Sequence, residues 1–306
     1  DWAWEQPEDM SLQAAVQALP DWADLSATAQ ADLRSAVHRM VEHEYAADWG
    51  TLSARSYDES AVFGGGDALV PGGYDQLAIH AARGLSIRLQ ARVRRIEAMA
   101  QGVRLGFDDE AEVTADAVDC TLPLGVQQSG GVVFAPALDA TRAAAIASLG
   151  MGLLNKCWLR FDAPPPAPAA DWILNLGPPA DLWPEWVNPQ DGATLLAFNA
   201  GPRADDIEAL GDADTIALAT EALRGMFGSQ FPRPVAGKVT RWRGDPLAFG
   251  SYSYHAPGSG AETRTALAGL DWEGRIAFAG EATSAHPSTV HGAWLSGLRA
   301  ADDLLG

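Results

Sequence analysis

The feature that most restricts the fold of this chain lies in its C-terminal stretch FAGEATSAHPSTVHGAWLSGLRAA (278–301). The stretch reads as a strand, an acidic residue at its end (Glu281), a short loop, and a helix that starts near Thr289. The free amides of a helix start suit an electron-rich acceptor, and an acidic residue at a strand end can bind ligand hydroxyls. The small residues Gly280 and Gly292 would permit close approach of a flat ring. The same pattern also fits an ordinary, tightly packed strand–loop–helix unit.

The rest of the chain interleaves helices and strands. Helices are predicted where apolar residues recur at helical spacing, and strands where β-branched residues cluster between polar turns. The proline-rich run 163–170 is expected to be a surface excursion, because its prolines remove backbone donors. Helices are predicted at 11–19, 27–47, 74–84, 139–149, 212–228 and 289–305, and strands at 87–99, 102–107, 111–122, 153–161, 194–201, 238–244 and 275–283. This order, with a meander in the middle, predicts a mixed α/β (α+β) architecture.

Charge and apolar content narrow the class of protein. Forty acidic residues against 21 basic ones give a net charge of −19, which argues against nucleic acid as a partner, because phosphate binding needs clustered Lys and Arg. An acidic protein attracts cationic substrates such as amines, although solubility alone also accounts for the charge. No apolar run approaches the roughly 18 residues of a membrane span, so we expect a soluble protein, with the cytoplasm favoured. Cys120 and Cys157 lie in apolar stretches and are predicted to be buried free thiols, and no metal site is predicted.

Several segments, taken in order, resemble the FAD-dependent amine oxidases, which include polyamine oxidases, flavin monoamine oxidases and flavin-type histone lysine demethylases. They are VPGGYDQLAIHAARGLSIRLQARVRRIE (70–97), DAVDCTLPLGV (116–126), SLGMGLLNKCWLRFD (148–162), TRWRGDPLAFGSYSYHAPG (240–258) and the C-terminal stretch 278–301. The resemblance covers about residues 50–306, and an ordered set of motifs is more specific than any one of them. It implies FAD as the cofactor and part of a Rossmann-like FAD-binding domain joined to an amine-oxidase substrate domain.

The resemblance also implies domain boundaries and one departure. The expected parts are a mainly helical piece of the substrate domain at 1–69, an FAD-domain segment at 70–126, the substrate-domain sheet and helices at 127–250, and a return to the FAD domain at 251–306. The family begins with a strand, a G-x-G-x-x-G turn and a helix, and this sequence contains no such unit. We therefore expect the chain to bind FAD poorly alone, and to be completed by a companion chain, either a separate gene product or part of a cleaved precursor.

The resemblance assigns catalytic roles to Lys156, Tyr252 and Thr289. Lys156 matches a lysine that holds a water near flavin N5; the alternative is an edge lysine that reaches solvent. Tyr252 matches the aromatic residue that flanks the substrate amine, which it would hold by shape and cation–π contact; the alternative is a core tyrosine. Thr289 stands where many monoamine oxidases carry a second aromatic, so the amine cage would have one aromatic wall.

The resemblance also implies the contacts to FAD. Glu281 should accept hydrogen bonds from the ribityl chain or ribose, and the backbone N–H of Val290 should face the pyrimidine edge of the flavin. Val93 should bracket the adenine through backbone contacts, and Trp242 should lie beside the flavin. The full set of expected cofactor contacts is Val93, Thr121, Leu122, Pro123, Trp242, Gly280, Glu281, Thr289 and Val290.

The implied reaction is oxidation of an amine. A hydride leaves the carbon next to nitrogen for flavin N5, the resulting imine is hydrolysed to an aldehyde or ketone, and oxygen or another acceptor reoxidises the flavin, usually giving H2O2. Two alternatives remain. An L-amino-acid oxidase would need a positioned arginine, for which Arg243 and Arg160 are candidates. A non-catalytic interaction subunit is the other alternative. His286 and His291 are acid–base candidates, but a histidine at a helix start is more often structural.

Overall fold

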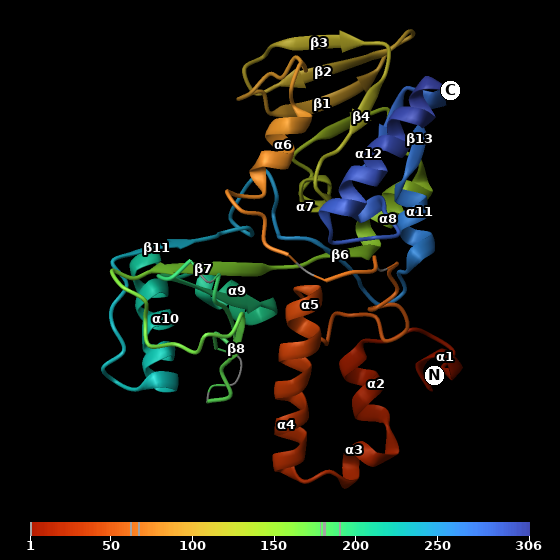
Figure 1. Cartoon of the computed structure of the whole chain (residues 1–306). Coiled ribbons are helices and arrows are strands. Elements are labelled where there is room, and N and C mark those ends of the chain that lie inside the picture. Colours follow the sequence, from red (N-terminus) through yellow and green to blue (C-terminus); the bar gives the residue numbers. More distant parts are fainter. Residues whose placement is uncertain (1, 62, 67, 178, 180–181, 190) are drawn as a thin grey trace.

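A computed structural model shows a chain built from three regions that meet at one point (Figure 1). It describes residues 2–61, 63–66, 68–177, 179, 182–189 and 191–306. The first helices form one region, the sheet that contains β7 and β11 forms the second together with its covering helices, and β1–β5 with the C-terminal helix α12 form the third. Helices and strands are mixed throughout, which confirms the predicted mixed α/β architecture.

The first region consists of short helices that precede residue 46. They are α1 (Trp2–Glu5), α2 (Leu12–Ala18), α3 (Pro20–Asp24), α4 (Ala27–Val37), a π-helical turn (His38–Glu42) and α5 (His43–Tyr45). Ser11 and Ser26 begin α2 and α4, because each hydroxyl accepts a hydrogen bond from a backbone amide three residues on. The predicted helix 27–47 therefore exists, but its second half is π-helical and it ends where Ala46 adopts a left-handed conformation.

The second region is an antiparallel sheet covered by helices. Its strand order is β11 (Ala236–Val239), β7 (Leu154–Arg160), β10 (Thr194–Ala200), β9 (Glu185–Val187) and β8 (Trp172–Leu174). Helices α9 (Gly201–Glu208) and α10 (Asp212–Phe227) cover one face (Figure 1). Strand β7 alternates, so Cys157 and Leu159 are buried against that side while Lys156 faces the other. This second face is therefore free to line a site.

The third region holds two small sheets around one core. The first has the order β3 (Glu112–Ala115), β2 (Val103–Phe107), β1 (Val93–Ala98), β5 (Val133–Ala135), and the second β13 (Gly269–Asp271), β14 (Ile276–Phe278), β4 (Val118–Cys120). Ile96, Val103, Cys120 and Phe278 pack into one hydrophobic cluster that joins the sheets. The surrounding elements are α6 (Asp75–Ala81), α7 (Leu124–Gln128), α8 (Ala140–Ser148), α11 (Ala261–Leu267), α12 (Val290–Leu305), and the strand pair β6 (Leu149–Met151) and β12 (Ser253–His255).

Three predicted strands are wrong in extent. The strand at 87–99 begins only at Val93, because residues 87–92 have no ladder partner in the described part of the chain. The strand at 111–122 is two strands in different sheets, since β3 pairs with β2 while β4 pairs with β14. The strand at 238–244 ends at Val239 and continues as a turn. Asp67 lies outside the described residues.

Two further observations concern the protein as a whole. Cys120 and Cys157 are buried free thiols, as predicted. Among the residues that the structure describes, no helix is both long and apolar enough to cross a membrane.

Candidate functional site

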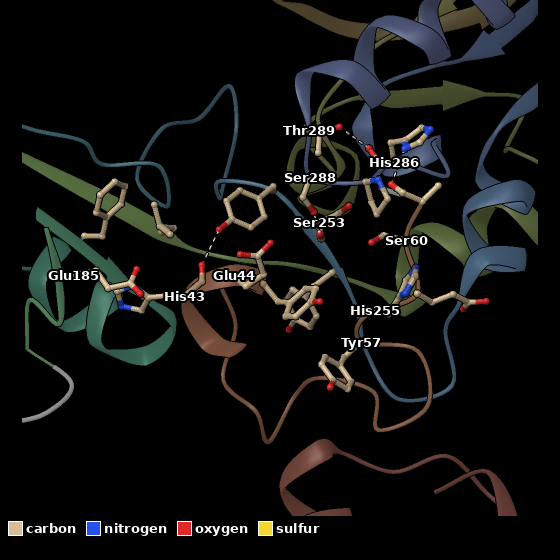
Figure 2. A pocket seen from close by; sticks show the side chains of 18 of the residues that line it. His43, Glu44, Tyr57, Ser60, Glu185, Ser253, His255, His286, Ser288 and Thr289 are labelled. Atoms are coloured by element: carbon tan, nitrogen blue, oxygen red, sulfur yellow. Dashed lines mark hydrogen bonds and ion pairs between the residues drawn. The ribbon is translucent and has the colours of Figure 1, made fainter. Parts of the chain in front are cut away.

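A cavity of about 960 Å³ lies where the three regions meet (Figure 2). Helix α5 and the segment that follows it form one wall, the open face of the β7–β10–β9 sheet a second, and the residues just before α12 a third. Lys156, Tyr252 and Thr289, the three residues predicted to be catalytic, all line this cavity although they are far apart in sequence.

One row of side chains crosses the sheet on the cavity side. The strand register places Lys156 opposite Phe198, Phe198 opposite Glu185, and Glu185 opposite Leu174. Directly opposed residues share a face, and all four line the cavity. Because neighbouring strands lie roughly 4.8 Å apart, Lys156 and Glu185 are separated by roughly 10 Å along this row. The row thus places a cation at one end, an aromatic ring in the middle and a carboxylate beyond it.

Lys156 is half-buried above an aromatic ring. Its Nζ lies 5.5 Å from the centroid of Phe198, within the range of a cation–π contact. Burial lowers the pKa of the Lys156 ammonium, because a low-dielectric site disfavours the charged form. Within the described residues no carboxylate forms an ion pair with Nζ. The lysine is therefore available to a water or ligand in the cavity.

Tyr252 forms an aromatic wall that is held in place by one hydrogen bond. Its hydroxyl donates to the backbone carbonyl of His43 at 3.1 Å (Figure 2). Burial raises the pKa of the Tyr252 phenol well above its ordinary value, so the side chain stays neutral. The hydroxyl hydrogen is used in this bond, so Tyr252 can contact a ligand through its ring but cannot donate a hydrogen bond to it.

The far end of the cavity carries carboxylates. Glu185 Oε2 lies 3.2 Å from Nδ1 of the buried His43, and Glu44 on α5 also lines the cavity (Figure 2). Burial lowers the pKa of His43, so its ring is neutral and Nδ1–H acts as a donor that orients the Glu185 carboxylate. This end of the cavity is suited to a cationic group.

The residues predicted to contact FAD gather beside two parallel strands. Strands β4 and β14 pair in parallel, and Cys120 stands opposite Phe278. The turn formed by Thr121, Leu122 and Pro123 therefore emerges at the same sheet edge as Gly280 and Glu281. Val93 belongs to the other sheet but packs into the same cluster as Leu122. Gly280 has φ of 124°, a conformation that favours glycine, and a Cβ there would meet no atom within 4 Å, so a ligand can approach.

Glu281 retains acceptor capacity after its internal bonds are made. Its Oε1 accepts from the Ser253 amide at 3.1 Å, and its Oε2 accepts from the Ser253 hydroxyl and the Ser288 amide, both at 2.7 Å. A carboxylate has about four acceptor positions, so one remains on Oε1. This free acceptor position fits a cofactor that carries hydroxyl groups, such as FAD.

Of the remaining predicted residues, Thr289 lines the cavity, whereas Val290 and Trp242 are not among its lining residues. Val290, the first residue of α12, is more than half exposed, and Trp242 is partly exposed on the turn after β11. The Thr289 hydroxyl accepts from the Gly292 amide and donates to the His286 carbonyl, so it caps α12 and has no proton left to give a substrate.

The histidines and arginines considered as alternatives have structural partners. His286 bonds the Ala61 carbonyl through Nδ1 and stacks on Phe63 with ring centroids 4.1 Å apart. Arg243 pairs with Asp205, and Arg160 with Asp191. Neither Arg243 nor Arg160 lines the large cavity, so neither is placed to bind the carboxylate of an amino-acid substrate there.

Sequence reasoning missed the carboxylate end of the cavity and the ring in its middle. Glu185 lies on a three-residue strand after the proline-rich excursion, and Phe198 gains its place only through register with Lys156. Side chains alternate between the two faces of a strand, so the sequence 194–200 could have placed Phe198 on the face opposite to that of Ala197. No local signal marks Glu185.

Comparison with known proteins gives consistent matches. The family model described as flavin containing amine oxidoreductase matches residues 3–305. Lysine-specific histone demethylase 1 homolog 1 of Arabidopsis thaliana is 34% identical over 278 residues, which cover 87% of this chain and 33% of that protein. Polyamine oxidase 4 of Oryza sativa subsp. japonica is 34% identical over 267 residues, which cover 86% of this chain and 54% of that protein.

Solved structures share the fold. Wild-type putrescine oxidase bound to putrescine matches with a TM-score of 0.72 and 19% identity, over 99% of this chain and 70% of that chain. By contrast, this chain spans between about a third and about half of the two plant relatives.

Proposed function

The chain belongs to the family of flavin containing amine oxidoreductases, and from this premise we propose that it supplies the amine-binding side of an FAD-dependent amine oxidase. The observation that carries the proposal is the single cavity that gathers Lys156, Tyr252 and the Glu185 carboxylate. Family membership implies FAD as the cofactor. When bound, FAD supplies the acceptor for a hydride from the carbon next to the amine nitrogen.

The residues of this chain bind and orient the substrate. The Tyr252 ring and the Phe198 ring bracket the reacting amine, and the lowered pKa of Lys156 keeps a second positive charge away from it part of the time. Lys156 also holds a water at the reacting end, where hydrolysis of the imine requires one. Burial of these groups excludes other water from the site.

The carboxylate end favours an amine that carries a second cationic group. Glu185 stands roughly two strand spacings from Lys156, and Glu44 lines the same cavity. A diamine or polyamine fits this separation, with its distal ammonium at Glu185 and its reacting carbon near Lys156. Polyamine oxidase 4 is among the relatives, and putrescine oxidase bound to putrescine is among the structures that share the fold; both support this substrate class here.

The predicted cofactor contacts are proposed to hold FAD at the shared edge of β4 and β14. Glu281 receives a cofactor hydroxyl at its remaining acceptor position, and the α12 start at Val290 presents its amide to the flavin. The cofactor would lie along the carboxyl ends of these two strands, which are followed by Thr121, Leu122, Pro123 and Gly280. As the resemblance implies, Val93 would contact the adenine of bound FAD, and Trp242 would contact its flavin.

We propose that a companion chain completes the cofactor site with the strand–GxGxxG–helix unit that this sequence does not contain. Strand β4 pairs only with β14 in the described part of the chain, so its other edge is open to a parallel strand. Val290, Trp294 and Leu298 form an exposed apolar stripe on α12 near that edge, since they are spaced four residues apart on one helix face. Such a stripe and such an edge are ordinarily covered.

Anaerobic mixing with amines tests this function. The native protein, with every polypeptide that purifies with this chain, is mixed with putrescine or with butylamine while the visible flavin absorbance is followed. We expect putrescine to bleach the flavin, and butylamine to do so at least tenfold less efficiently. A bound flavin that no mono-, di- or polyamine reduces would contradict the proposal and favour a non-catalytic interaction subunit.

A further inference from the structure

A group of buried polar side chains lies beneath Glu281, outside the set of residues considered above as catalytic. Arg264 on α11 is only 3% exposed, and His255 and Ser253 on β12 are likewise buried. A buried guanidinium is expensive unless every donor and the charge are satisfied, so its presence calls for a specific use.

The hydrogen bonds of Arg264 converge on β12. Its Nε donates to His255 Nε2 at 2.6 Å, and its Nη1 donates to the Ser253 hydroxyl oxygen at 2.7 Å and to the Ala282 carbonyl at 3.2 Å. Arg264 forms no direct ion pair with Glu281 among the described residues, but the Glu281 charge favours its charged form. The two charges are joined through one serine hydroxyl.

The histidine in this group must be neutral and in one tautomer. His255 Nδ1 lies 2.7 Å from the Ser56 carbonyl, which can only accept, so Nδ1 carries the hydrogen. Its Nε2 then offers a lone pair to Arg264. A proton on Nε2 would set two donors against each other at 2.6 Å, so the neutral ring fixes the direction of the guanidinium.

The serine has only one proton, and the arginine decides where it goes. Because the Ser253 oxygen accepts from Arg264, its hydrogen must be donated elsewhere, and the acceptor in reach is Glu281 Oε2 at 2.7 Å. Glu281 therefore accepts at that oxygen, and the orientation of its carboxylate follows from that of Ser253.

From this geometry we infer that Arg264 is a positioning residue for the cofactor site: through Ser253 it fixes the Glu281 carboxylate, with one acceptor position on Oε1 left for a single hydroxyl of FAD. The inference rests on the proposed function, because it takes Glu281 as a ligand of the flavin nucleotide. It assigns a role in cofactor binding to a buried arginine that the resemblance does not mark.

A matched pair of buried arginines tests it. Arg142 is 5% exposed, donates to carbonyls of Leu267 and Leu270 at the end of the same α11 region, and has no contact with Ser253 or Glu281 in the described structure. FAD dissociation constants of the native assembly are measured for wild type, Arg264→Gln, Ser253→Ala and Arg142→Gln. We expect at least tenfold weaker FAD binding for the first two variants and less than a twofold change for Arg142→Gln, at a comparable loss of melting temperature.

The pH profile separates positioning from a general loss of structure. Protonation of His255 at Nε2 would set a second donor against Arg264 Nε and release the guanidinium from Ser253, so the acid limb of FAD affinity should be reduced in Arg264→Gln and not in Arg142→Gln. The charged groups near Glu281 and His255 are Arg264, Glu59 and Glu262, and the titratable Tyr252 faces Glu281. Of these groups, only Arg264 differs between Arg264→Gln and Arg142→Gln. Unchanged FAD affinity and an unchanged acid limb in Arg264→Gln would overturn the inference. If the wild-type assembly itself binds no FAD, the proposed function fails instead.

Discussion

At the scale of single residues, Lys156 lies in an environment unlike that of an ordinary surface lysine. Its pKa is lowered by burial and its ammonium lies over the Phe198 ring. Lys156→Met keeps the volume and removes the donor. We expect flavin reduction or reoxidation to slow at least tenfold while FAD stays bound, measured by stopped-flow absorbance. Lys238→Met, on the exposed strand β11, is the control; traces that match wild type for Lys156→Met would remove this lysine from the mechanism.

Tyr252 is the second single residue with a testable role, since its ring should contribute to amine binding as one wall of the cavity. An aromatic wall contributes roughly 0.5–2 kcal/mol to a bound cation or amine, which is roughly 2- to 30-fold in dissociation constant. Tyr252→Ala should weaken amine binding by that factor, whereas Tyr252→Phe should keep most of it, since the hydroxyl bonds only the His43 carbonyl. Reductive half-reaction titrations measure both; equal affinity in wild type and Tyr252→Ala would refute the wall.

Two buried histidines predict how stability changes with pH. Burial lowers the pKa of His43 and of His255 below the ordinary value of 6.5. Between the folded-state and unfolded-state pKa values of each histidine, the unfolded chain therefore binds more protons than the folded chain. The contribution of the two neutral histidines to folding stability is fully present above about pH 6.5 and is lost as pH falls below it. Melting temperatures from pH 8 to pH 5 should fall on the acid side. His255→Gln should flatten this fall, and an equally steep fall in that variant would show that other groups cause it.

At the scale of elements, α12 carries two different surfaces. Gly292, Ser296 and Ala300 are buried against the sheet, while Val290, Trp294 and Leu298 are more than half exposed on the other side. Trp294→Glu should weaken association with the companion chain at least tenfold, because a carboxylate would be buried in an apolar interface. Val235→Glu, an equally exposed apolar site near β11, is the control. Sedimentation or size-exclusion profiles that are identical for both would argue against this face as the interface.

The sequence predicted long elements better than short ones. Helices such as α10 and α12 and strands such as β7 and β10 were placed within a few residues, because their periodicity extends over several turns or alternations. Strands of three residues, including β8, β9 and β12, gave no periodic signal and exist through pairing with distant partners. The same reason hid Glu185 and the Ser253–His255 group, whereas Lys156, Tyr252 and Glu281 lie in motifs that a resemblance could identify.

At the scale of the whole molecule, the open edge of β4 and the stripe on α12 mark where the cofactor half should attach. A surface that completes a sheet and covers such a stripe resembles a domain core cut in two, and it should exceed the roughly 2,000 Å² at which obligate interfaces begin. FAD would touch both sides of this interface. Binding of the companion and binding of FAD should therefore stabilise each other.

Native mass spectrometry of the purified protein tests most directly the claim that this chain forms one side of a shared flavin site. The account predicts an assembly that contains the 32.3 kDa chain, a companion polypeptide and FAD, in which the companion and the FAD are lost together as collision energy rises. A stable 32.3 kDa monomer that retains FAD without any further polypeptide would contradict it.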